Sequence, residues 1–174
     1  MGAFMALATY AQPMLEPAGV SETSAGLILA GMMVAGVVAS AIVPVWADRH
    51  RREVQFMGAS IALTAGVCLI LAVAASTAMA YVMLIGIGLV LLPALPIVLA
   101  LTERHAPEAE GTAAGLIWLS GNLGGVVLST VVGLLVTHAS LDFVVLACLI
   151  LLALPALLRY GRLDNQGAGA ASEA

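Results

Sequence analysis

Every positively charged side chain of this protein lies between or beyond its long apolar segments. The chain contains no Lys, and its six Arg residues are Arg49, Arg51, Arg52, Arg104, Arg159 and Arg162. When the chain is threaded back and forth through a bilayer, all six fall on one side. Cytoplasmic loops of integral membrane proteins carry such an excess of positive charge. The pattern therefore predicts a multi-pass membrane protein whose Arg-bearing side faces the cytoplasm.

The composition requires lipid as the solvent for most of the chain. Apolar residues make up 62% of the 174 positions and charged residues 9%, whereas soluble domains have about 45–50% and about 25%. A helix needs roughly 20 apolar residues to cross the hydrocarbon core. We expect six crossings, at about 1–15, 23–47, 54–75, 78–101, 111–137 and 141–158. These segments are too continuous for barrel strands, which alternate, so the predicted fold is all-α with six transmembrane helices.

The two ends of the chain differ from its centre. Residues 1–158 are expected to form one transmembrane unit, and residues 159–174 a disordered cytoplasmic tail. The first span offers only about 15 residues before Glu16, short for a crossing. It lacks the positive n-region of a signal peptide, so we interpret it as the end of a helix whose beginning is missing. The expected location is the plasma (inner) membrane, with the C-terminus in the cytoplasm.

Small and polar residues form one stripe along the fifth span. The stripe, with spacings of four or three residues, consists of Gly111, Gly115, Trp118, Asn122, Gly125, Ser129 and Gly133. Two small-xxx-small pairs, Gly111 with Gly115 and Gly121 with Gly125, allow helices to approach closely. A polar side chain near mid-span needs a partner. Asn122 is therefore expected either to form an interhelical hydrogen bond or to line a cavity.

Two other spans supply candidates for a cavity lining. Pro93 and Pro96 interrupt the fourth span, where each removes a backbone donor. Broken helices often mark transporter sites, although they also occur as plain kinks. Tyr10 and Gln12 lie toward the outer end of the first span, and Gln12 fits either an interfacial position or an outward-opening cavity.

No arrangement typical of an enzyme is present. The three His residues lie in loops or at span ends, no span has metal-ligand spacing, and there is no P-loop. No basic patch with aromatic residues suggests nucleic acid. We therefore predict a non-enzyme without catalytic residues, cofactor or metal, whose partner is the lipid bilayer. Cys68 and Cys148 are expected to be apolar packing residues.

The turn after the second span carries a recognisable motif. The segment Pro44-Val45-Trp46-Ala47-Asp48-Arg49-His50-Arg51-Arg52 resembles the loop signature of the major facilitator superfamily. That signature reads Gly, three residues, Asp, Arg or Lys, any residue, Gly, Arg, then Arg or Lys. Asp48, Arg49 and Arg52 match it. Pro44 and Arg51 replace its two Gly, and Glu53 replaces its last basic residue.

The resemblance implies a fold and a function. The six spans would be helices seven to twelve, the C-terminal half of a twelve-helix bundle that transports a small solute by alternating access. Asp48, Arg49 and Arg52 would form a cytoplasmic gate, with Asp48 just before the N-terminus of the next helix, where the dipole favours a carboxylate. The partner would be the missing N-terminal half or a second copy of this chain. A non-transporting membrane scaffold and an inactive remnant remain as alternatives.

Overall fold

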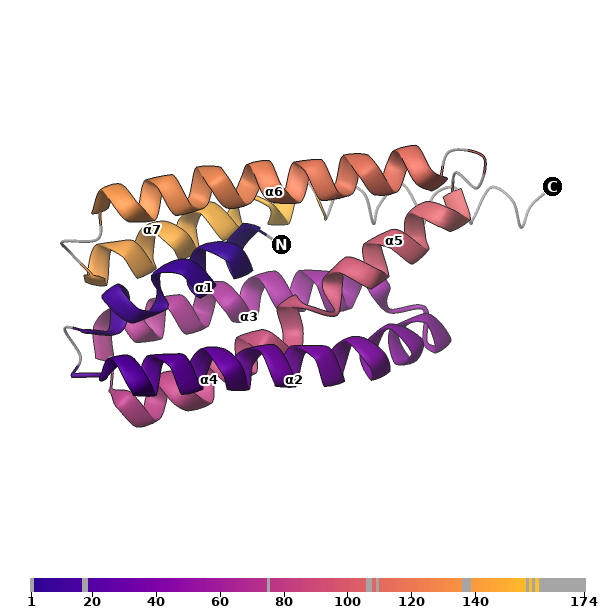
Figure 1. The fold of residues 1–174 in the computed structure, drawn as a ribbon. Coiled ribbons are helices and arrows are strands. Elements are labelled where there is room, and N and C mark those ends of the chain that lie inside the picture. Colours follow the sequence, from indigo (N-terminus) through magenta and orange to yellow (C-terminus); the bar gives the residue numbers. More distant parts are fainter. Residues whose placement is uncertain are drawn as a thin grey trace.

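The described part of the chain is entirely helical. The computed structural model describes residues 2–16, 19–74, 76–105, 108, 110–135, 139–155, 157 and 159. Within these ranges there is no strand, which agrees with the predicted all-α class (Figure 1). The helices are α1 Gly2–Leu15, α2 Glu22–Arg49, α3 Glu53–Ala74, α4 Thr77–Leu91, α5 Ala94–His105, α6 Glu110–Leu135 and α7 Ala139–Leu151.

Four segments are long and apolar enough to cross a membrane. They are Glu22–Arg49, Glu53–Val73, Thr77–Arg104 and Gly111–Leu134, and a shorter apolar helix covers Leu141–Leu151. Helix α1 has 14 residues, fewer than the roughly 20 of a full crossing. Of the expected cytoplasmic tail, all but Arg159 lies outside the described residues. The structure is therefore that of an integral membrane protein.

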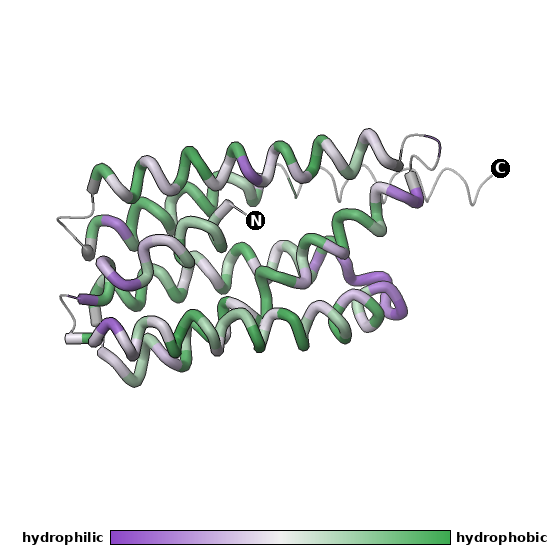
Figure 2. Tube along the Cα trace, in the orientation of Figure 1, coloured by the Kyte–Doolittle hydropathy of each residue, from purple (hydrophilic) through white to green (hydrophobic). Residues whose placement is uncertain are grey.

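The segments with Arg residues meet at one end of the bundle. The α2–α3 turn and the last turn of α5 form a hydrophilic group there, whereas the bodies of the helices are apolar (Figure 2). We call this the arginine-bearing end. The opposite, arginine-free end contains the last turns of α1, α3 and α6 and the first turns of α2, α4 and α7. The one-sided charge that the sequence indicated is thus present in the fold for Arg49, Arg51, Arg52 and Arg104.

The fourth predicted span is interrupted, as its two Pro residues indicated. Helix α4 ends at Leu91 and α5 begins at Ala94. Between them the Leu95 N–H donates to the Leu92 carbonyl at 3.4 Å, and the regular pattern resumes where Ile97 N–H donates to Pro93 O at 3.3 Å. Pro93 has no N–H to donate, so the ladder opens here. Pro96 lies in the first turn of α5, where a missing donor matters little.

Small residues bring the helices into contact in pairs. The main pairs are α2 with α4, α3 with α7, and α1 with α6. Gly88 of α4 lies so close to α2 that a Cβ on it would overlap the Met32 carbonyl oxygen, and a Cβ on Gly36 would meet Leu92 at 2.7 Å. The α2–α4 contact is therefore backbone against backbone, a packing that membranes favour because lipid supplies no hydrophobic drive between helices.

The largest cluster of buried apolar residues sits toward the arginine-free end. It contains Leu15 of α1, Ile28 of α2, Leu71 of α3, Leu84 of α4 and Phe143 of α7, each at most 2% exposed. These residues lie in the halves of their helices that border the arginine-free turns. The arginine-bearing ends of α2, α3 and α5 contribute little to this cluster. Apolar packing therefore fixes one end of the bundle much more firmly than the other.

Candidate functional site at the arginine-bearing end

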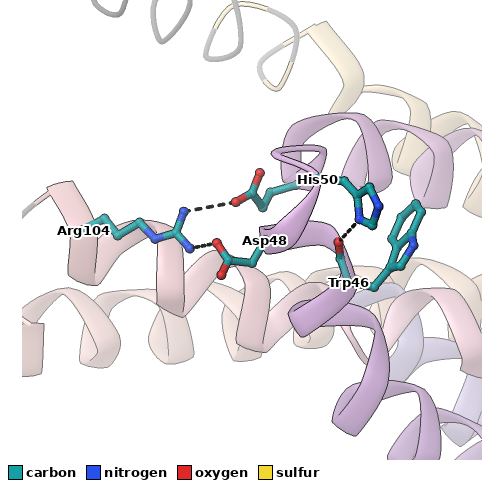
Figure 3. A network of polar contacts seen from close by, with 5 residues as sticks. Trp46, Asp48, His50 and Arg104 are labelled. Atoms are coloured by element: carbon teal, nitrogen blue, oxygen red, sulfur yellow. Dashed lines mark hydrogen bonds and ion pairs between the residues drawn. The ribbon is translucent and has the colours of Figure 1, made fainter.

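A single guanidinium joins three helix ends at the arginine-bearing end. Arg104 Nη2 donates to Asp48 Oδ1, and Arg104 Nη1 donates to Glu53 Oε1 at 3.1 Å. Arg104 comes from the last turn of α5, Asp48 from the last turn of α2 and Glu53 from the first turn of α3. Figure 3 shows Arg104 reaching between the two carboxylates. We call these three residues the ionic bridge.

The backbone of the α2–α3 turn holds the two carboxylates on the same side. Arg52 N–H donates to Ala47 O at 3.0 Å, and Arg51 N–H donates to Asp48 O at 3.1 Å. Arg51 has φ +50°, the left-handed conformation. This pair of bonds with a left-handed residue is the Schellman motif, which ends a helix by satisfying its last carbonyls. Because the motif reverses the chain within three residues, Asp48 and Glu53 both reach Arg104.

Helix dipoles support two of the three members of the bridge. Arg104 stands at the C-terminus of α5, where positive charge is favoured, and Glu53 stands at the N-terminus of α3, where negative charge is favoured. Asp48 differs from its expected position. It lies inside the last turn of α2, which ends at Arg49, and α3 begins only at Glu53. The favourable dipole position therefore belongs to Glu53, and Asp48 depends on Arg104 for its compensation.

Arg49 and Arg52 form no ion pair with Asp48 in the described part of the chain. Both side chains are exposed. Among the described residues, the ion pairs are those of Arg104 with Asp48 and Glu53, and neither involves Arg49 or Arg52. Of the three predicted gate residues, only Asp48 thus belongs to the ionic bridge. The gate role of the other two stays a prediction.

Asn122 satisfies its amide within its own helix. Its Nδ2 donates to the Trp118 carbonyl at 2.8 Å, and the residue is exposed on α6. This bond lies within α6, whereas the sequence predicts either an interhelical hydrogen bond or a cavity-lining position. It leaves the amide oxygen on an open face of α6, so a role in lining a cavity stays a prediction.

The other predicted cavity residues do not converge on Asn122. Tyr10 lies beside the last turns of α6, because a Cβ on Gly133 would meet its hydroxyl at 2.5 Å. Gln12 is exposed, and Pro93 is buried at the α4–α5 break. Gly2 lies against Gly124 and Gly125, next to Asn122. Since ten residues of helix span about 15 Å, Gln12 and Asn122 lie at different depths.

The four glycines that the sequence assigned to helix packing have different surroundings. A Cβ on Gly125 would meet Met5 of α1 at 3.3 Å, so this glycine lies against a neighbouring helix. At Gly111 and Gly115 a Cβ would meet nothing within 4 Å. Gly121 is half-buried. Among the described residues the first two turns of the α6 stripe are thus open, and a role for Gly111 and Gly115 in packing would need a partner outside these residues.

Near the ionic bridge, a small pocket lies between α5 and α6. Its volume is about 130 Å³, and its lining is Leu99, Thr102, Glu103, Gly111 and Ala114. A drug-sized ligand needs about 300–1,000 Å³, so this pocket alone is too small for one. Within the described ranges, no three His, Cys, Asp or Glu residues are close enough together to hold a metal ion.

A comparison with known protein families identifies the family of this chain. Residues 1–173 match the family model described as Major Facilitator Superfamily. The chain belongs to the major facilitator superfamily. Its members are transporters rather than enzymes, so membership supports a function in membrane transport. The match includes the α2–α3 turn, whose sequence resembles the superfamily signature.

The chain shares substantial identity with a relative over most of its length. An uncharacterized protein of Archaeoglobus fulgidus is 32% identical to this superfamily member over 129 residues, which cover 74% of this chain and 59% of that protein. The chain therefore spans about three fifths of the length of the curated relative it matches. This relative carries no assigned activity that could be compared.

Sequence reasoning missed the two partners of Asp48. The sequence alone presents Arg104 as a charge that sets topology and Glu53 as a departure from the superfamily signature. A signal was available, since Arg104 was placed on the same side of the membrane as Asp48. The sequence does not give the direction of α5, which depends on the break at Pro93 and which decides whether Arg104 reaches Asp48.

Proposed function

We propose that this chain is the C-terminal half of a secondary transporter that moves a small solute by alternating access, and that the ionic bridge is its gate. Superfamily membership supports transport. The pairing of α1 with α6, α2 with α4 and α3 with α7 is compatible with one compact half of a larger bundle. The observation that carries the gate is Arg104, which ties the end of α5 to both sides of the α2–α3 turn.

The distribution of packing explains why charge would act as a gate here. The apolar cluster lies toward the arginine-free end, so the arginine-bearing end can open without exposing it. Helix α5 is joined to α4 through the break at Leu92 and Pro93, and it runs away from α2 toward the start of α6 (Figure 1). The break would serve as a hinge and the ionic bridge as the latch at the far end of the hinged segment.

The proposed transport path needs a second half. Six helices would supply one wall of a cavity, and the open part of the α6 stripe from Gly111 to Asn122 would face it. The partner would be an N-terminal half or a second copy of this chain. The arginine-bearing end would face the cytoplasm of a cell bounded by its plasma (inner) membrane, as the Arg bias favours, and the C-terminus would lie on the same side.

Alkylation of a cysteine at position 122 tests the gate. In a background with Cys68 and Cys148 replaced by Ala, N122C is treated with a membrane-impermeant maleimide applied from either side of the membrane. If the bridge closes the path, R104Q raises the labelling rate from the arginine-bearing side, whereas the charge-conserving R104K raises it less. R159Q removes equal charge outside the bridge and serves as the control.

The outcomes separate the alternatives. Labelling of N122C that responds to R104Q from one side favours a gated cavity. A cysteine that reacts from neither side in any variant would place position 122 in lipid or in a permanent packing contact, as expected for a scaffold. Robust solute uptake by the purified monomeric chain in liposomes would remove the need for a partner half.

A further inference from the structure

The α2–α3 turn carries three guanidinium groups that the ionic bridge leaves unused. Arg104 occupies both acidic side chains of this segment, Asp48 and Glu53. Arg49, Arg51 and Arg52 are all exposed, and in the part of the chain that the structure describes no ion pair involves them. Compact positive charge at the end of a membrane-spanning helix attracts anions from the membrane surface. The turn is therefore a cationic surface with capacity for an anionic ligand.

An apolar column leads along α2 to this cationic surface. Ile42, Val45, Trp46 and Arg49 follow the spacing that places residues on one helix face. Ile42 and Val45 are largely exposed, and Trp46 is 46% exposed. The face thus changes from aliphatic to aromatic to guanidinium toward the membrane surface. A phospholipid has the same order of groups, from acyl chain through the glycerol region to the phosphate.

Trp46 of this column packs against His50, which follows the last turn of α2. The ring centroids of Trp46 and His50 are 5.0 Å apart at an interplanar angle of 34°, and His50 Nδ1 lies 2.9 Å from the Trp46 carbonyl oxygen (Figure 3). Trp is enriched at membrane–water interfaces because its ring is amphipathic. The last turn of α2, and with it the α2–α3 turn, therefore belongs at the level of the lipid headgroups.

Arg51 is the residue that closes the Schellman motif of this turn. Its φ is +50°, a conformation that is unfavourable for residues with a Cβ and that Gly adopts freely. This position is one of the two at which the resembled signature has Gly. Arg51 therefore adds a third exposed guanidinium to the turn at a position where Gly would carry no charge.

We propose that the α2–α3 turn binds the headgroup phosphate of an anionic phospholipid through Arg49, Arg51 and Arg52, while the Ile42–Trp46 face accommodates an acyl chain. Guanidinium groups pair with phosphate oxygens in bidentate geometry, and the turn offers three of them at headgroup depth. The inference does not depend on the transport proposal, since it uses none of the residues of the ionic bridge. It also concerns Arg51, which stands where the superfamily signature has Gly.

Tryptophan quenching by brominated lipids tests this directly. The chain has two Trp residues, so W118F leaves Trp46 as the only reporter. The full-length W118F chain is reconstituted in vesicles of dibrominated phosphatidylglycerol mixed with plain phosphatidylcholine, and in the reverse mixture. We expect Trp46 to be quenched more strongly by the anionic lipid, with a relative association constant of at least about fivefold, the ratio expected from one juxtamembrane cation. The preference should fall as ionic strength rises to about 1 M.

Variants at position 51 separate ligand binding from folding. R51G relieves the left-handed backbone and removes the guanidinium, so it should fold at least as well while lowering the anionic preference about twofold or more. R51K retains the charge and should keep most of the preference. The triple variant R49Q/R51Q/R52Q should abolish it. R159Q, which removes one positive charge outside the turn, should leave it unchanged.

Three results would overturn the proposal. Equal quenching of Trp46 by both brominated lipids would show that the turn does not select the headgroup. An anionic preference that survives in the triple variant would assign it to other residues. Loss of the preference on addition of about 10 mM inorganic phosphate, at constant ionic strength, would show that a soluble anion rather than a lipid headgroup occupies the turn.

Discussion

Removal of the Arg104 guanidinium should loosen the arginine-bearing end without unfolding the bundle. The side chains of Arg104 and Asp48 are 48% and 55% exposed, and that of Glu53 is 12% exposed. An exposed ion pair contributes about 0.2–1 kcal/mol. Taking about 0.5 kcal/mol for the Asp48 pair and about 1 kcal/mol for the more shielded Glu53 pair, R104Q costs about 1.5 kcal/mol. This corresponds to roughly a tenfold change in the ratio of closed to open ends.

A distance between spin labels measures this opening. Labels on Q55C of α3 and E103C of α5 occupy exposed positions beside the bridge, in a chain whose two native cysteines are replaced by Ala. Double electron–electron resonance in lipid nanodiscs should give a narrow distribution for the parent chain. R104Q should shift population to longer distances, and E53Q should shift it more than D48N because the Glu53 pair is less exposed.

Two results would contradict the role of the ionic bridge in holding α5. An unchanged distance distribution in R104Q would mean that apolar contacts, rather than the ionic bridge, hold α5 in place. A loss of helix content together with the distance change would mean that the bridge stabilises the whole fold. R159Q serves as the matched loss of positive charge and should leave the distribution as it is in the parent chain.

Three further predictions concern stability, each measured as the unfolding free energy of purified protein in detergent. G88A should destabilise the chain by about 1–3 kcal/mol through overpacking against α2, whereas G86A, at a position with open space, should be nearly neutral. G133A should be destabilising because its methyl group meets the Tyr10 hydroxyl, and adding Y10F should recover part of the loss; additive effects would contradict the contact. R51G should stabilise the chain by roughly 1 kcal/mol by removing left-handed strain, and a loss of stability would contradict the Schellman assignment.

The sequence predicted the membrane class and the sorting of charge well, because both depend on composition and spacing alone. A run such as 54–75 is apolar enough to be recognised without knowing its neighbours, and α3 covers Glu53–Ala74. The break near Pro93 was also predictable, since proline acts on its own backbone. These features depend on local chemistry, which a sequence states directly.

The ionic bridge was only partly predictable because it depends on how distant segments meet. Asp48 was identified from its motif, but Arg104 lies 56 positions further along the chain. Their contact requires both the α2–α3 reversal at Arg51 and the direction of α5 after the break. Asn122 gives the opposite example. Its helix-internal bond to Trp118 was available from the spacing of four residues, a pairing that side-chain amides readily form.

The buried polar residues of α3 and α7 were not predicted at all. Thr64 and Asp142 are fully buried, and they lie in the strongly apolar helices α3 and α7. The cause is the pairing of α3 with α7, which turns one face of each helix inward. Uniformly apolar helices give little information about which face is buried, so the sequence offered no means to place these two side chains.

Cysteine labelling of the two ends of α2 tests the central claim, that the arginine-bearing end lies in the cytoplasm and the arginine-free end on the opposite side of the membrane. In the chain without native cysteines, T23C and H50C lie at exposed positions near opposite ends of this helix. A membrane-impermeant maleimide added to intact cells should label T23C and leave H50C unlabelled until the membrane is permeabilised. Labelling of both positions from the same side, or of H50C alone from outside, would contradict the topology and remove the basis for the proposed gate.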